Sequence, residues 1–279
     1  MLCRTFCHIP GIGHKLEREL WRAGVTSWER WRNPPPLPLS AVTRLEAERL
    51  LARSAEALSD DPLFFTSRLE NAQGWRIFPQ FRERTAYLDI ETTGLGADSA
   101  ITTIALYDGR EVRTFVNGDN LEDFIDAVAP FQVLVTYNGK GFDIPFIERF
   151  FRITLPQAQI DLRFVLARLG FKGGLKGCER KLGLHRGALD GVDGLFAVRL
   201  WHAFRHSGDE RYLHTLLAYN VADTVNLERL MVEAYNRNLA VTPFADELLP
   251  CPQPPSLPFF ADGDCIAALG GGHAPSGRY

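Results

Sequence analysis

The spacing of hydrophobic residues divides the chain into three zones. In residues 1–84 the apolar positions follow a helical period: a glycine turn precedes one helix that should end at Gly24, and Ser40 is a plausible N-cap for a second helix through about Leu58. The periodicity of the second helix comes from Val42, Leu45, Leu50, Leu51 and Leu58. We therefore expect residues 1–84 to form a small helical region.

Residues 85–240 begin with short apolar runs that have the length of strands. Three runs rich in β-branched or aromatic residues follow one another with glycines between them, TAYLDIE, AITTIALYD and REVRTFVN, and they predict an antiparallel meander. FQVLVTYNG is a later apolar run suited to a buried strand. The expected helices are LEDFIDAVA, IPFIERFF, DLRFVLARLG, LKGCERKLG, LFAVRLWHAFRHSG and a long one from roughly Glu210 to Tyr235. This order of elements predicts a mixed α/β layer domain.

The third zone, residues 241–279, contains the proline- and glycine-rich stretches PQPPSLP and LGGGHAPSGRY. Such a composition favours a loosely packed arm, so we expect this tail to be flexible. No internal repeat is visible in any of the three zones.

Composition excludes a disordered or fibrous protein and leaves most globular functions open. Hydrophobic residues make up 46% of the chain and charged residues 23%, which is ordinary globular usage. The formal net charge of -3 gives no global basic field, although an enzyme built around a carboxylate cluster would offset its own basic surface. Five cysteines, an odd number, favour a reducing compartment, and neither a secretory signal nor a membrane-spanning stretch is visible. We expect a soluble, cytoplasmic protein without a membrane partner.

Four acidic residues and a tyrosine stand out in three separate motifs. Asp89 and Glu91 alternate along the first strand, so both carboxylates point to one face, where they repel each other unless a cation compensates them. Asp143 follows the buried strand, at the strand end where ligands commonly bind. Tyr219 and Asp223 are spaced i, i+4 and share one face of the last helix. Each motif alone also has a purely structural interpretation, as a polar strand end, a helix N-cap and a surface pair.

Taken together and in this order, the motifs D-I-E, N-x3-F-D and Y-x3-D resemble the three exonuclease motifs of the DEDD superfamily of 3′→5′ exonucleases. YNGKGFDIPF and the tyrosine of the third motif are similar to the proofreading domain of family B DNA polymerases. The arrangement is closer still to the bacterial YprB-type ribonuclease H-like family. The resemblance covers roughly residues 84–235 and implies a ribonuclease H-like α/β fold, in which a mixed sheet, an antiparallel meander plus parallel strands, is flanked by helices.

The resemblance also implies what the site residues do. The metal ligands of the family transfer to Asp89, Glu91, Asp143 and Asp223. They would hold two divalent cations, Mg²⁺ or Mn²⁺. Tyr219 would orient the attacking water, because a phenol with an ordinary pKa of about 10 is a poor base at neutral pH. The histidine subclass of the family needs a histidine where this chain has Ala218, so the resemblance is to the tyrosine subclass.

Contacts to nucleic acid are expected at two places. By family analogy, Thr92 and Thr93 border the terminal nucleotide, and Asn138 offers an amide close to Asp143. Residues 161–186 hold seven basic residues against two acidic ones, so this stretch suits a phosphate backbone. The proposed contacts are Lys172, Lys176, Arg180 and Lys181. A solvated helix face is an equally good interpretation of these charges.

The first residues contain two weaker motifs. HIPGIGHKLERELWRAGV resembles the hairpin and second helix of a helix-hairpin-helix element, whose backbone amides contact DNA phosphates. The usual first helix is missing, so simple packing through Leu16, Leu20 and Trp21 competes with DNA contact. Cys3, Cys7, His8 and His14 suggest a zinc site, but the C-x3-C-H spacing places adjacent ligands awkwardly and argues against one.

These observations predict a helical N-terminal region (1–84), a ribonuclease H-like exonuclease domain (85–240) and a flexible tail (241–279). The expected function is that of a metal-dependent 3′→5′ exonuclease acting on single-stranded nucleic acid, with DNA weakly preferred. The alternatives are an exoribonuclease, which contact with a 2′-OH would distinguish, and a non-catalytic nucleic-acid-binding module on the same fold. The presence of all four carboxylates favours an enzyme.

Overall fold

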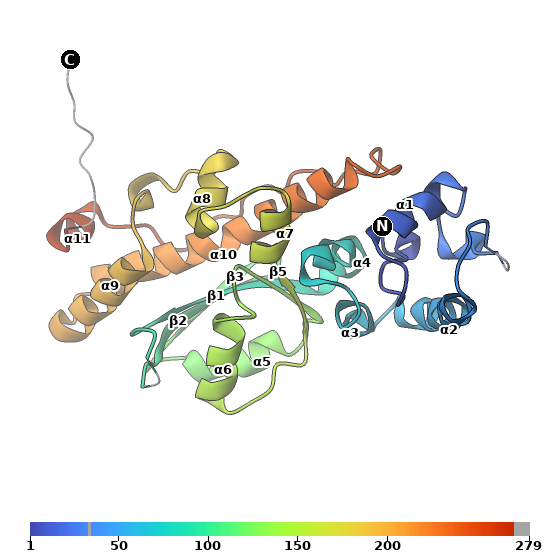
Figure 1. The fold of residues 1–279 in the computed structure, drawn as a ribbon. Coiled ribbons are helices and arrows are strands. Elements are labelled where there is room, and N and C mark those ends of the chain that lie inside the picture. The colour runs from blue at the N-terminus through green and yellow to red at the C-terminus, as the bar shows by residue number, and fades with distance from the viewer. Residues whose placement is uncertain (33–34, 97, 271–279) are drawn as a thin grey trace, which may run out of the picture.

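A five-stranded mixed sheet lies at the centre of the molecule (Figure 1). The computed structural model describes residues 1–32, 35–96 and 98–270. The strands are β1 (Thr85–Thr92), β2 (Ile101–Tyr107), β3 (Val112–Val116), β4 (Val133–Thr136) and β5 (Ala158–Asp161), in the order β3-β2-β1-β4-β5. β1, β2 and β3 pair antiparallel, while β4 pairs parallel to β1 and β5 parallel to β4. The expected meander, buried strand and mixed sheet are confirmed, and β5 is an addition that its short sequence AQID does not announce.

Helices cover both faces of the sheet (Figure 1). On one face lie α5 (Phe124–Val128) and α6 (Asp143–Phe151), and on the other α7 (Leu162–Arg168), α8 (Gly174–Lys181), α9 (Gly194–Ser207) and α10 (Glu210–Leu239). The alternation of side chains along β1 serves both layers, because Leu88 and Ile90 pack with α6 whereas Tyr87 belongs to the core shared with α10. Odd-numbered residues of β1, including Asp89 and Glu91, therefore face α10.

The N-terminal region extends the apolar core that lies between the sheet and α10. It contains α1 (His14–Arg22), α2 (Ala41–Ala57), α3 (Pro62–Thr66) and α4 (Phe78–Phe81). Its short 3₁₀ turns are η1 (Leu2–Arg4), η2 (Trp28–Arg30), η3 (Asn71–Arg76) and η4 (Arg82–Arg84). Two more, η5 (Leu121–Asp123) and η6 (Gly187–Leu189), lie farther along the chain. In the described ranges, no helix combines the length and the apolar character needed to span a membrane.

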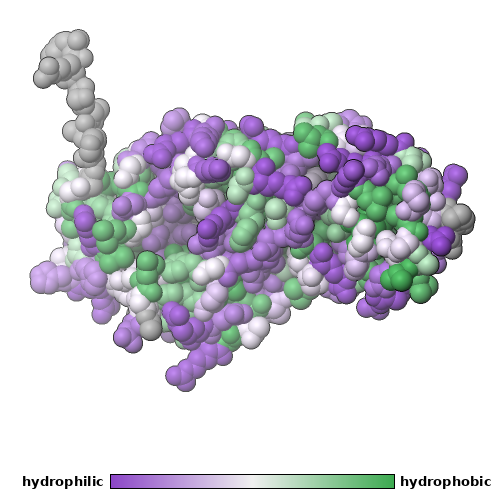
Figure 2. Space-filling view, viewed as in Figure 1, coloured by the Kyte–Doolittle hydropathy of each residue, from purple (hydrophilic) through white to green (hydrophobic). Residues whose placement is uncertain are grey.

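The two expected N-terminal helices form, but the apolar stripe of the second is only partly correct. Ser40 caps α2 by accepting a hydrogen bond from the Thr43 amide at 3.0 Å. Leu50 and Leu51 are buried as expected, whereas Val42 and Leu45 are 78% and 69% exposed. The reason is that the buried face of α2 begins only at its second turn, so the first turn projects beyond the core. Figure 2 shows hydrophobic surface on this part of the molecule, at the right of the view.

The chain after α10 runs back along that helix as far as it is described. The side chain of Asn236 donates to and accepts from the Leu249 backbone at 2.8 Å in each bond. Farther along, the Asp262 amide donates to Thr215 Oγ1 at 3.0 Å, and α11 (Gly263–Ala268) buries Cys265. Leu249 and Asp262 thus contact α10, while residues 271–279 of the expected flexible tail lie outside the described residues.

His8 is a buried histidine in the N-terminal region that titrates far from its ordinary range. Its neighbour Ser54 donates its hydroxyl to the Leu50 carbonyl at 2.7 Å, so His8 Nε2 must be the donor in its 2.8 Å hydrogen bond to Ser54 Oγ. Burial, aided by the charges of Arg76 and Arg68, lowers the pKa of His8 to about 4. The folded protein therefore keeps this imidazole neutral.

We predict that His8 makes stability fall as the pH is lowered. In the unfolded chain His8 has an ordinary pKa of about 6.5 and is protonated at pH 5, whereas in the folded chain it stays neutral. The free energy of unfolding should therefore drop by about 2 kcal/mol between pH 7 and pH 5. His8→Gln retains an N–H donor for Ser54 but does not titrate. Urea unfolding of both proteins at the two pH values measures the difference, and an equal pH dependence in both would contradict the prediction.

Candidate active site

The first pair of carboxylates lies on the central strand. Asp89 and Glu91 are two residues apart on β1 and face α10. Glu91 is almost fully buried and Asp89 half-buried. Asn220 of α10 donates its side-chain amide to Asp89 Oδ2 at 2.8 Å and accepts from Thr103 Oγ1 at 3.1 Å. This bridge ties α10 to β1 and β2 and fixes the position of Asp89.

The third motif reaches the same place from α10. Tyr219 and Asp223 are separated by one helical turn and both are buried. One carboxylate oxygen from each of Asp89, Glu91 and Asp223 lies within 4.8 Å of the others. Two motifs that are separated by more than a hundred residues therefore converge on one point.

Asp143 approaches the cluster from the second motif. It is the first residue of α6 and is buried, and its Oδ1 accepts a hydrogen bond from the Ile90 amide at 3.2 Å. This bond places Asp143 beside the residue between Asp89 and Glu91. The negative charge of Asp143 raises the pKa of Glu91, and that of Asp89 raises the pKa of Asp143. The four expected ligand residues thus lie together.

Burial makes the charged forms of these carboxylates costly. Burial raises the pKa of Asp89 to about 7 and the pKa values of Glu91 and Asp143 well above their ordinary range, and repulsion from neighbouring carboxylates of the cluster adds to the effect for Glu91 and Asp143. Hard divalent cations prefer carboxylate oxygens and would relieve this repulsion. The donor set and its electrostatics therefore fit the divalent cations expected from the sequence.

Tyr219 lies next to Lys176, one of the phosphate contacts proposed from the sequence. Lys176 Nζ donates to the Tyr219 hydroxyl and to the Val192 carbonyl, and it lies 4.3 Å from the centre of the tyrosine ring. Burial lowers the pKa of Lys176 to about 8 and raises the pKa of Tyr219 far above its usual value. Lys176 was proposed together with Lys172, Arg180 and Lys181. Of these four, Lys176 is part-buried against Tyr219 and the other three are exposed, and contact of the four with phosphates stays a prediction.

Two further charged residues complete the centre and were not assigned a role from the sequence. Arg186 forms an ion pair with Asp223 and a second ion pair with the buried Glu179, with Nε–Oε2 and Nη2–Oε1 distances of 2.8 and 2.6 Å. Asn226 donates to Glu179 at 2.8 Å. Arg186 and Glu179 were visible only as charges of the basic stretch, and Asn220 only as a neighbour of Tyr219. No spacing rule would have identified the three.

The remaining expected contact residues are engaged within their own loops. Thr92 Oγ1 donates to the Gly94 carbonyl at 2.8 Å, and Thr93 Oγ1 accepts from the Ala100 amide at 3.0 Å. Asn138 has a positive φ of 67°, and its Oδ1 accepts from Arg163 Nη1 at 2.5 Å. Contact of these residues with a nucleotide stays a prediction.

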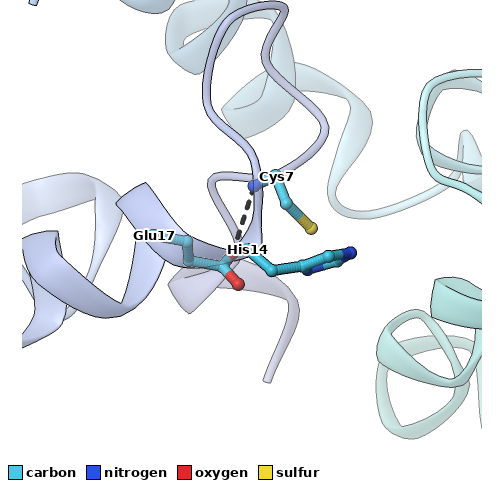
Figure 3. A group of neighbouring side chains, drawn as sticks. All are labelled: Cys7, His14 and Glu17. Atoms are coloured by element: carbon cyan, nitrogen blue, oxygen red, sulfur yellow. Dashed lines mark hydrogen bonds between the residues drawn. The ribbon is translucent and has the colours of Figure 1, made fainter.

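A second group of potential metal ligands, Cys7, His14 and Glu17, lies in the N-terminal region (Figure 3). Glu17 already accepts hydrogen bonds from the Phe6 and Cys7 amides at 2.7 and 3.1 Å and pairs with buried Arg76 at 2.7 Å. Burial raises the pKa of the Cys7 thiol to about 12, so it stays protonated. The negative charge of Glu17 is fully compensated, which makes this group a structural ion pair and a poor cation site.

We predict that Glu91→Gln raises the melting temperature of the metal-free protein by about 1 to 3 °C at pH 8. The folded-state pKa of Glu91 lies above its unfolded value, so its charge costs stability at high pH and the cost disappears at low pH as the carboxylate becomes protonated. The gain should therefore shrink at pH 5. Thermal unfolding in EDTA measures it, with the exposed Glu122→Gln as control. A lower melting temperature at pH 8 would show that Glu91 is not strained by burial.

Comparisons with known proteins identify the family to which the chain belongs. The family model of the RNase_H superfamily matches residues 86–235, which is more than half of the chain. No curated protein matches it. Among solved structures, the family B DNA polymerase from the hyperthermophilic archaeon Pyrobaculum calidifontis is similar over 59% of this chain, with a TM-score of 0.42 and 16% identity, and the match spans only 26% of the polymerase. On the family match, the chain belongs to the RNase H superfamily.

Proposed function

We propose that this protein is a metal-dependent 3′→5′ exonuclease that hydrolyses phosphodiester bonds of single-stranded nucleic acid. The observation that carries the proposal is the convergence of Asp89, Glu91, Asp143 and Asp223 beside the phenol of Tyr219. Membership in the RNase H superfamily supports a nuclease. The order of the three motifs supports the DEDD group and its tyrosine subclass.

The four carboxylates would hold two divalent cations, Mg²⁺ or Mn²⁺. Bound cations stabilise the attacking and leaving oxygens of a phosphodiester and lower the pKa of a bound water. Asp89, which lies on the central strand with the carboxylates of Asp143 and Asp223 nearby, would help to hold these ions. Asn220 holds its carboxylate in place for this task.

Tyr219 would act as a hydrogen-bond donor and not as a base. Its raised pKa keeps the phenol protonated at neutral pH. Because Lys176 donates to the phenolic oxygen, the phenolic hydrogen is free to point to another acceptor. A water between Tyr219 and the carboxylates would be held by this hydrogen, which orients it for attack.

The substrate would be a single strand, with DNA weakly preferred. Lys172, Arg180 and Lys181 are exposed and form a basic surface suited to phosphates. The turn before α1 supplies a second candidate contact with DNA. All five cysteines are free thiols, which supports a reducing, cytoplasmic setting. An exoribonuclease remains the second candidate, since no contact that would read a 2′-OH has been identified.

We predict that the wild-type protein shortens a 5′-labelled single strand from its 3′ end in Mg²⁺ or Mn²⁺, and that EDTA stops the reaction. Asp143→Asn should abolish hydrolysis without loss of folding, because it removes a ligand charge and relieves repulsion in the cluster. DNA and RNA strands of one sequence and a circular single strand should be digested in parallel, and the products separated by length. The exposed Asp119→Asn is the control.

The possible outcomes separate the alternatives. Full activity in Asp143→Asn would contradict the assignment of the site. Cleavage of the circular strand would indicate an endonuclease, and digestion of RNA alone would indicate an exoribonuclease. Binding of both strands without cleavage in either metal would leave a nucleic-acid-binding module on the same fold.

We predict that Tyr219→Phe lowers the turnover number by about 10- to 1000-fold, the range expected when one positioning hydrogen bond to the transition state is lost. KM for the strand and the Mn²⁺-induced rise in melting temperature should stay close to wild type, because neither depends on the hydroxyl. Steady-state kinetics and thermal unfolding with Mn²⁺ measure the two properties. An unchanged turnover number would assign Tyr219 to packing only.

A further inference from the structure

Arg186 is a buried cation that pairs with two carboxylates. Its side chain is 3% exposed and lies between Asp223 on α10 and Glu179 on α8. The two nitrogens that face Glu179 form a bidentate pair with that carboxylate, and the third nitrogen contacts Asp223 Oδ1. All three guanidinium nitrogens therefore have carboxylate partners.

Glu179 holds the guanidinium in this place. Its side chain is 2% exposed, and Asn226, three residues after Asp223 on α10, donates to its Oε1 at 2.8 Å. If Arg186 left, Glu179 would remain as an uncompensated buried charge, which is costly. The ion pair with Asp223 is therefore a built feature of the fold.

The consequence concerns one carboxylate of the four. Asp223 forms an ion pair, whereas none involves Asp89, Glu91 or Asp143 in the described part of the chain. The guanidinium contacts Oδ1 of Asp223, and a cation at that oxygen would lie against the positive charge of Arg186. The charges of Arg186 and Lys176 also lower the pKa values of Asp89 and Glu91, but the direct contact of Arg186 is with Asp223, so attraction for a divalent cation is weakest at Asp223.

We propose that Arg186 is a fixed counter-cation of Asp223 that lets the centre bind one divalent cation tightly and weakens the binding of a second. This inference rests on the proposed function, because it assumes that the carboxylates are metal ligands. Arg186 is a positioning residue in this scheme, since it acts through Asp223. Its effect is on metal binding before any substrate is present.

The experiment is a titration of the full-length protein with Mn²⁺ alone. Calorimetry and the electron paramagnetic resonance of free Mn²⁺ measure the binding. Wild type should bind one equivalent tightly and a second weakly. Arg186→Gln keeps a hydrogen-bond donor near Glu179 without the charge, and it should tighten the second equivalent by about 10-fold or more, the scale on which a nearby charge alters the proton affinity of a carboxylate. Adding Asp223→Asn to Arg186→Gln should remove this gain.

Two further variants serve as controls. Arg180→Gln removes one positive charge from an exposed position of α8, next to Glu179, and should leave Mn²⁺ binding unchanged. Arg186→Met combined with Glu179→Leu replaces the buried ion pair by apolar side chains. This double variant should fold even if Arg186→Gln is destabilised by its unpaired Glu179. It should bind the second equivalent of Mn²⁺ as tightly as Arg186→Gln does. Circular dichroism checks that each variant is folded.

The failures of the two proposals are distinguishable. Two equally tight equivalents in wild type, or a second equivalent that Arg186→Gln does not tighten, would overturn the role of Arg186 and leave the metal centre in place. An equal gain in Arg180→Gln would reduce the effect to net charge and also overturn it. Absence of Mn²⁺ binding in wild type and in all variants would overturn the proposed metal-dependent function itself.

Discussion

Negative charge gathered inside the fold is the constraint on which the rest of the structure depends. Glu91, Asp143 and Asp223 are buried, and burial together with mutual repulsion makes the charged forms of Glu91 and Asp143 costly. The fold holds the carboxylates together by placing the first on a central strand and spanning it with α10, which Asn220 fastens to Asp89. Such a concentration of charge needs cations, and the chain itself supplies Lys176 and Arg186.

The buried acid Glu17 shows how a carboxylate is compensated within the protein itself. Glu17 accepts two backbone amides and the fork of Arg76, and its position joins α1 to the turn before α4. Every oxygen of that carboxylate has a strong donor. In the described part of the chain, Glu91 has no side-chain hydrogen bond and no ion pair of its own. Glu17, whose oxygens all have donors, therefore stabilises the fold, whereas Glu91, which has none among the described residues, is suited to binding a ligand.

Much of the fold could be predicted from the sequence because it depends on local pattern, whereas the carboxylate set followed from the resemblance of the three motifs to a known family. Strand periodicity identified the meander, and i, i+4 spacing paired Tyr219 with Asp223. The parts that failed depend on tertiary packing. Val42 and Leu45 match the helical period, yet both side chains are exposed, because the buried face of α2 begins at Ala47. The partners of Arg186 are set by how α8 packs on α10, which spacing along the chain does not encode.

The basic stretch shows how one run of charges acquires two environments. Gly173 and Gly174 adopt positive φ values of 103° and 70°, which ordinary side chains avoid, and α8 starts at this turn. One face of the short helix then buries Glu179 against α10, with Lys176 beside it, while Arg180 and Lys181 remain exposed. Charges that look equivalent in the sequence are thereby divided. The inner Lys176 lies beside the carboxylates, and the outer Arg180 and Lys181 face solvent. The proposed nuclease must concentrate acids and still attract a polyanion, so it needs both kinds of charge, and α8 carries both.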